Sequence, residues 1–176
     1  MVQAPTRAMA PGRRDFGRKL LLEQVVCAHT TCMTIIATTT ITSTAPPAAF
    51  FARWADMATW PDWNADTEWV RLDGDFREGA TGVLKPKGGP KVRFVVERLV
   101  PGEEFVDVSR LVGARLTFAH LVTARAGGGT EVTVTVSMTG PLGRLWQLVL
   151  GSGVRGSLRT DAEALARAAE TATRSA

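Results

Sequence analysis

Two side chains on neighbouring segments of this sequence could move a proton, His120 and Asp107. Both segments have the alternating pattern of β-strands, and the turn at Gly113 between them predicts a hairpin. In one register Asp107 lies beside His120 on the inner face, where a carboxylate could orient the imidazole as a general base. In the other register Val106 and Val108 are buried and Asp107 faces solvent. A third interpretation is a hydrogen-bonded core histidine, as most single histidines on an apolar face are.

Two further patterns are weaker signals for chemistry. Residues 151–156 read GSGVRG and match the GxGxxG of dinucleotide-binding loops, but only 20 residues follow them. No second strand can then complete the βαβ unit that such a site requires. Small residues in a helix instead favour a close approach to the sheet or a bend near residues 151–153. Three lysines, Lys85, Lys87 and Lys91, surround a Gly-Gly turn and indicate either a solvated loop or a contact with an acidic head group.

The cysteines and the charge exclude several classes of protein. Cys27 and Cys32 are the two cysteines, too few and too isolated for a disulfide framework or a zinc site. We therefore expect no metal and no cofactor. The net charge is +4, but residues 1–32 alone contribute five basic and two acidic side chains. The remainder is nearly neutral, which argues against nucleic-acid binding.

Residues 1–32 need separate treatment. Arg13-Arg14 is similar to a twin-arginine export signal, but the apolar run Leu20 to Leu22 is too short for one. Two interpretations remain: a disordered or loosely helical extension, or translation that begins at Met33. In both, a folded domain spans residues 33–172, a short tail spans residues 173–176, and the domain folds without the first 32 residues.

The pattern from Met33 onward predicts one α+β domain. β-branched residues predict a first strand, and the Pro-Pro pair after it predicts the entry into two short helices. Glycine- and proline-rich turns separate the later strands, as in an antiparallel sheet. Helices are expected at residues 48–55, 57–60 and from Pro141 to about Glu170. Strands are expected at residues 34–44, 67–72, 80–84, 91–99, 103–109, 114–123 and 130–139. No apolar run approaches the length needed to span a bilayer.

The faces of the strands indicate where a ligand would bind. Val134 and Val136 share one face of the last strand, and Phe118 and His120 share one face of the strand before it. We expect these faces to point toward the long helix and to enclose an apolar cavity with it. The predicted lining comprises Trp54, Trp69, Phe94, Val96, Phe118, Val134, Val136, Trp146 and Val149.

The order of several short motifs resembles a known superfamily. The motifs are APP at residues 45–47, WPDW at residues 60–63, VPG at residues 100–102 and GGTEVT at residues 128–133. Together, over residues 35–170, they resemble the SRPBCC superfamily, and within it the polyketide cyclase/dehydrase-like branch. The resemblance implies a helix-grip fold, in which a curved antiparallel sheet of about seven strands wraps around a long C-terminal helix. It also implies an apolar pocket between them.

Two classes of function follow. The first, which we favour, is binding of a hydrophobic small molecule such as a lipid or polyketide; the second is an aromatic polyketide cyclase or dehydrase. The resemblance implies that cyclases use pocket Tyr and Arg side chains, yet this chain has no Tyr. Its Arg candidates are Arg110, Arg115 and Arg155, and alternation puts Arg115 opposite His120. A filled cavity would instead indicate an interaction module. We expect a cytoplasmic monomer or homodimer that neither spans a membrane nor binds nucleic acid.

Overall fold

The computed structural model describes residues 33–175, and the expectations for the first 32 residues lie outside this part. The helices are α1 (Pro47–Ala55), the 3-10 helix η1 (Met57–Thr59), α2 (Trp60–Trp63) and α3 (Gly143–Arg174). The strands are β1 (Thr34–Ser43), β2 (Thr67–Leu72), β3 (Thr81–Pro86), β4 (Val92–Val100), β5 (Glu104–Leu111), β6 (Ala114–Ala124) and β7 (Thr130–Thr139).

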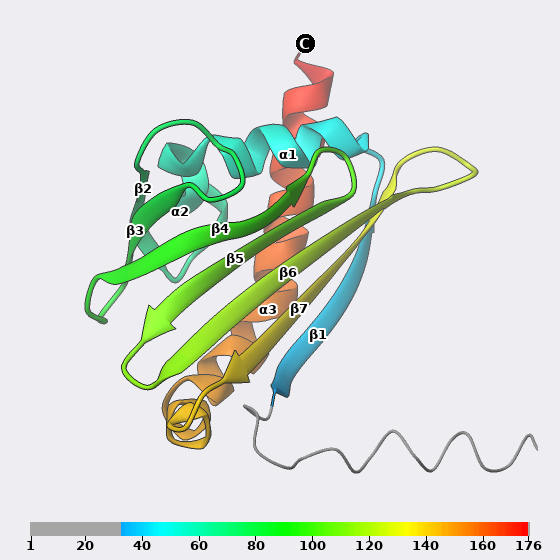
Figure 1. Cartoon of the computed structure of the whole chain (residues 1–176). Coiled ribbons are helices and arrows are strands. Elements are labelled where there is room, and N and C mark those ends of the chain that lie inside the picture. The colour runs from blue at the N-terminus through cyan, green and yellow to red at the C-terminus, as the bar shows by residue number, and fades with distance from the viewer. Residues whose placement is uncertain (1–32, 176) are drawn as a thin grey trace, which may run out of the picture. The chain divides into compact units, whose positions relative to one another are not determined.

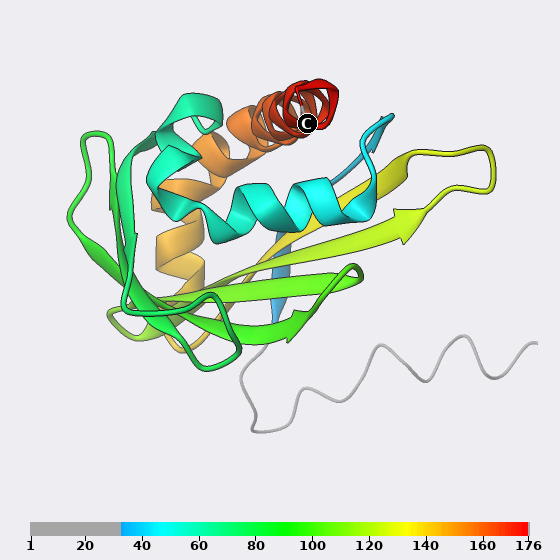
Figure 2. The same ribbon diagram turned by 90° about the horizontal axis from the view of Figure 1, so that it is seen from above.

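All seven strands form one antiparallel sheet in the order β1-β7-β6-β5-β4-β3-β2. Consecutive strands from β2 to β7 pair as hairpins, and β1 closes the order by pairing with β7. The helices lie on one face of this curved sheet, with α1 and α3 crossing it (Figures 1 and 2). This is the helix-grip arrangement expected from the sequence.

Glycine conformation fixes the hairpin that carries the candidate site. Gly113 has a φ of +64°, a conformation that glycine adopts without strain, and it allows a short turn between β5 and β6. That turn sets the register in which Leu111 pairs with Ala114 and Asp107 pairs with Phe118. A shift by one residue would move every side chain of the hairpin to the other face.

The helix α3 has two halves that run in different directions, visible where its yellow-orange start meets the orange and red remainder (Figures 1 and 2). Gly151 and Gly153, near which the sequence indicated a bend, belong to the first half of this helix. The helix continues to Arg174, so Thr173 and Arg174 of the predicted tail at residues 173–176 belong to it.

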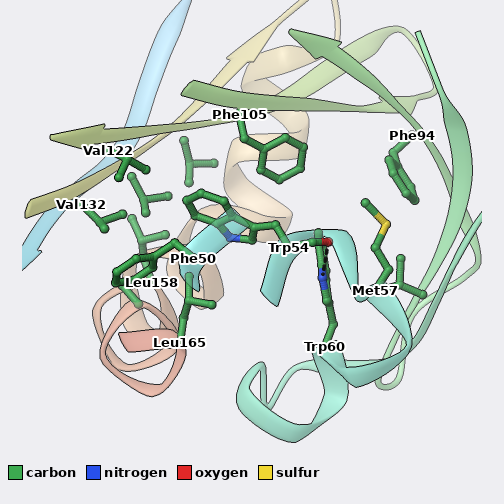
Figure 3. Close-up of a cluster of buried hydrophobic side chains, with 14 of the residues drawn as sticks. Phe50, Trp54, Met57, Trp60, Phe94, Phe105, Val122, Val132, Leu158 and Leu165 are labelled. Carbon is green, nitrogen blue, oxygen red and sulfur yellow. Dashed lines mark hydrogen bonds between the residues drawn. The ribbon is translucent and has the colours of Figure 1, made fainter. Parts of the chain in front are cut away.

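The core lies between the sheet and the helices. Trp54 of α1 is 1% exposed and lies between Phe105 of β5 and Leu158 of α3 (Figure 3). The indole N–H of Trp60 donates a 3.1 Å hydrogen bond to the Trp54 carbonyl, which ties α2 to the end of α1. Phe50 is fully buried one turn earlier on the same helix. Phe50, Trp54 and Trp60 therefore belong to the core.

Candidate ligand-binding site

Strand pairing settles the face on which Asp107 lies. Asp107 pairs with Val96 of β4 and Phe118 of β6, and Phe118 pairs with Val136 of β7. Directly paired residues of an antiparallel sheet point to the same face, so these four side chains form one row. Val96 and Val136 are fully buried in the core, which identifies the row as facing the helices.

His120 lies in a second row, two residues further along β6 from Phe118. His120 pairs with Phe105 of β5 and with Val134 of β7. Val134 is buried and Phe105 is fully buried, so this row also faces the helices. Val106 and Val108 are buried as well, on the other face of β5. Both alternatives for β5 were therefore partly correct: Asp107 points inward, and the two valines are buried nonetheless.

The imidazole of His120 is held by an aromatic pair and a carbonyl. Its ring stacks on Phe105 at 5.0 Å between centroids and 13° between planes, and Trp54 lies 5.0 Å away on α1. Its Nδ1 is 3.1 Å from the Phe105 carbonyl oxygen. Because a carbonyl only accepts, we assign the proton to Nδ1, which leaves Nε2 as an acceptor. Burial lowers the pKa of His120 to about 4, against the smaller opposing effect of the Phe105 hydrogen bond.

Asp107 is 8% exposed, and the two side chains paired with it across the sheet, Val96 and Phe118, are apolar. Burial raises its pKa to about 7, although a hydrogen bond with its own backbone opposes the rise. Among the described residues, the inner face of the sheet carries no Lys or Arg that could stabilise the anion. Asp107 therefore exchanges its proton near neutral pH, where His120 is neutral.

The two groups do not form the direct pair that the sequence suggested. Asp107 lies opposite Phe118, two residues before His120, so the two are diagonal neighbours, whose typical separation is about 7–8 Å. No hydrogen bond joins them in the described part of the chain. The hydrogen bond that orients the imidazole in this structure is the one with the Phe105 carbonyl.

An unpaired donor lies in the same region. The indole N–H of Trp54 is buried and has no acceptor within residues 33–175. An unsatisfied buried donor typically costs about 1–3 kcal/mol, so natural proteins rarely keep one without a reason. The region around His120 thus combines an unpaired donor, a free imidazole acceptor and a carboxylic acid among apolar side chains.

Most predicted lining residues share the inner side of the fold. Phe94 of β4 is buried against Gly82 of β3, at the next inward position before Val96. Phe118 and His120 are only partly buried, although the residues paired with them on β7, Val136 and Val134, are buried. Trp146 of α3 is partly buried, and its indole N–H donates a 2.8 Å hydrogen bond to the Val112 carbonyl.

Two predicted lining residues lie elsewhere. Trp69 pairs with Lys85 on the face of β2 opposite the buried Val70, with Arg71 and Lys91 over its ring. Val149 is 61% exposed on the outer side of α3. Neither belongs to the lining, because the register of β2 and the rotation of α3 turn them away from the core.

Sequence reasoning missed two residues of this region. Phe105, which stacks on His120, and the buried Ser109 occupy the positions two before and two after Asp107. The alternation of β5 would have found both once Asp107 was placed inward. Of the Arg candidates, Arg115 is bonded to Glu97 on the outer face, while Arg110 and Arg155 are exposed.

Two features are absent from residues 33–175, a metal site and a helix that could cross a membrane. The His, Cys, Asp and Glu side chains of these residues form no group of three that could hold a metal ion. None of their helices combines the length and the apolar character that a membrane crossing requires.

Comparison with known protein families identifies the chain. Residues 34–170 match the family described as "Polyketide cyclase / dehydrase and lipid transport". The chain belongs to this family. A search of curated proteins found no match.

Solved structures of the same fold include enzymes. The Zhui aromatase/cyclase from a Streptomyces species is 16% identical, with a TM-score of 0.64 over 79% of this chain and 94% of that one. Truncated norcoclaurine synthase from Thalictrum flavum is 10% identical, with a TM-score of 0.60 over 80% of this chain and 95% of that one. At these identities the likeness shows the shared helix-grip fold.

Proposed function

We propose that this protein binds a hydrophobic small molecule between the inner face of the sheet and the helices, with a polar group of the ligand near Asp107 and His120. The observation that carries this proposal is a carboxylic acid buried on an apolar face without a cationic partner. A buried, uncompensated carboxyl group is unfavourable for folding, and such groups cluster at functional sites.

The polar groups of this region suit an amphipathic ligand. A carbonyl or hydroxyl oxygen could accept from the unpaired indole N–H of Trp54 or from protonated Asp107. A hydroxyl could donate to Nε2 of His120. Phe118 and the aromatic neighbours of His120 would contact the apolar body of the molecule.

A second candidate is a polyketide cyclase or dehydrase that acts in the same region. It is favoured by the opposed pKa values of Asp107 and His120, which leave one group able to exchange a proton near pH 7 and the other neutral. The absence of Tyr from the chain and of a cationic side chain from the described inner face argues against it. Enolate chemistry on a poly-β-keto substrate needs such donors to stabilise the developing oxyanion. We therefore favour binding without turnover.

Dye displacement tests the binding proposal. An apolar fluorescent dye should bind the purified protein, and Phe118→Trp should weaken that binding at least tenfold by filling the space beside Asp107. Leu121→Trp is the matched control, since Leu121 is 53% exposed on the outer face of the same strand. Native mass spectrometry of the purified protein should reveal a co-purifying apolar molecule. Equal dye affinity in all three proteins would refute the proposed position of the ligand.

The substitution His120→Gln separates the two candidates. In a binding protein it changes affinity by about two- to tenfold, the equivalent of one neutral hydrogen bond. In an enzyme that uses His120 as a general base it lowers turnover by roughly 10²–10⁴-fold with little change in affinity. Multiple turnover of a poly-β-keto substrate that His120→Gln abolishes would establish the enzyme.

A further inference from the structure

The first half of α3 exposes an apolar stripe. Leu142, just before the helix, and Leu145, Leu148 and Val149 within it recur at the spacing of one helical face, and all four are exposed. Leu148 is 83% exposed, the most of any large apolar side chain in the described part of the chain. Scattered exposed leucines are ordinary, but a contiguous set marks an interaction surface.

The same helical segment is apolar on its inner side too. Trp146, Leu150 and Val154 recur at four-residue spacing and pack against the core. The second half of α3 differs, because Leu158, Leu165 and other buried residues face inward while its outer side is polar. A helix segment that is apolar on both sides normally has apolar surroundings on both sides.

The β5–β6 turn extends the stripe. The backbone N–H of Leu142 donates a 3.0 Å hydrogen bond to the Gly113 carbonyl, and its side chain lies against Gly113. Val112, the neighbour of Gly113, is 76% exposed and accepts the hydrogen bond from Trp146. We call Val112, Leu142, Leu145, Leu148 and Val149 the α3 patch. Figure 1 shows the β5–β6 turn and the start of α3 at the same end of the domain.

The segments that form the α3 patch and its surroundings carry only positive charges. The two segments that form it and its surroundings, residues 108–118 and 132–160, contain no Asp or Glu. Their basic residues are Arg110, Arg115, Arg144, Arg155 and Arg159, all of them exposed. Two of the five have acidic partners, Arg115 in Glu97 on the outer face of the sheet and Arg159 in Glu163 one turn further along α3. Arg110, Arg144 and Arg155 form no ion pair within residues 33–175.

We infer that the α3 patch docks on the surface of an anionic lipid bilayer. Leucine and valine side chains would enter the boundary between head groups and acyl chains, while Arg144 and Arg155 at the edge of the stripe meet lipid phosphates. A second copy of this chain is the competing occupant. Two copies joined by this patch would bring arginines together, and the segments around it offer no carboxylate to pair with them. This inference does not depend on the proposed ligand.

Vesicle flotation of the full chain tests this inference. The protein should float with vesicles of equal parts phosphatidylcholine and phosphatidylglycerol, and far less with phosphatidylcholine alone or in high salt. The double variant Leu145→Gln/Leu148→Gln should reduce binding by about tenfold or more. In the wild type both leucine side chains move from water into the bilayer, and the variant loses the free energy of that transfer. Leu121→Gln, an exposed leucine on the outer face of β6, is the apolar control and should bind as the wild type does.

A second pair of variants tests whether the arginines beside the α3 patch contribute to vesicle binding. Arg144→Gln should weaken binding about fivefold, the value of one basic residue at an anionic surface, whereas Arg167→Gln on the second half of α3 should not. Sedimentation of the same proteins measures self-association. Three results would overturn the inference: no flotation of the wild type, flotation that the leucine variant does not reduce, or a dimer that the leucine variant dissociates without any vesicle binding.

Discussion

The buried pair Asp107 and His120 predicts opposite pH dependences of stability in two single variants. For Asp107 the folded pKa is about 7 against 3.8 for the free side chain. The folded state therefore holds this proton more tightly, and the stability that it contributes below about pH 4 is lost as the pH rises to about 7. For His120 the folded pKa is about 4 against 6.5. Its contribution is present above about pH 6.5 and is lost as the pH falls to about 4.

The magnitudes follow from about 1.4 kcal/mol per unit of pKa difference. The Asp107 shift corresponds to about 4 kcal/mol and the His120 shift to about 3 kcal/mol. Between about pH 4 and 6.5 the two dependences have opposite signs and nearly cancel. The wild type should therefore gain or lose little stability from this pair across that interval.

Each single variant removes one titrating side chain, so its stability shows the pH dependence that comes from the remaining one. Asp107→Asn leaves the His120 contribution, so its free energy of unfolding should fall by about 3 kcal/mol relative to the wild type between pH 6.5 and 4. His120→Gln leaves the Asp107 contribution, so its stability should rise by about 3 kcal/mol relative to the wild type over the same interval. The double variant should again follow the wild type.

Urea unfolding followed by tryptophan fluorescence at several pH values measures these differences. Other titrating groups, such as Asp161 with its raised pKa and Glu170 with its lowered pKa, are common to all four proteins and cancel in the comparison. Parallel stability curves for all four proteins would refute the reasoning, because they would mean that both side chains titrate as they do in water.

Three further predictions concern the fold. Phe50→Ala should lower the free energy of unfolding by about 3–5 kcal/mol, because the Phe50 side chain of α1 is fully buried in the core; urea unfolding measures the loss. Gly129→Ala should destabilise by at least about 2 kcal/mol, since φ is +80° and an added Cβ would lie 2.2 Å from the Ser43 carbonyl oxygen. Gly127→Ala in the same turn meets no atom within 4 Å, and equal losses in both variants would contradict this account. Removal of residues 1–32 should shift Tm by only a few degrees, and loss of cooperative unfolding would show that the domain needs them.

The sequence by itself determined the elements and the faces that β6 and β7 turn toward the helices. Alternating valines in β7 and glycine-rich turns between strands indicated an antiparallel sheet, and the strand bounds agree with the structure to within about two residues. Val134 and Val136 lie inward as their spacing requires. These properties are local, because backbone conformation and the two-residue period of a strand depend on near neighbours.

The tertiary structure alone decided the chemistry of the site and the surface that α3 presents. Both faces of β5 are buried, so the pattern around Asp107 could not show which way its carboxyl group points; the Gly113 turn and the pairing with Phe118 settle it. The pKa values of Asp107 and His120 depend on burial by segments distant in sequence. The outward rotation of Val149 follows from the anchoring of α3 to the β5–β6 turn. A sequence pattern gives the apolar side of an element, whereas its surroundings are set by contacts between segments far apart in the chain.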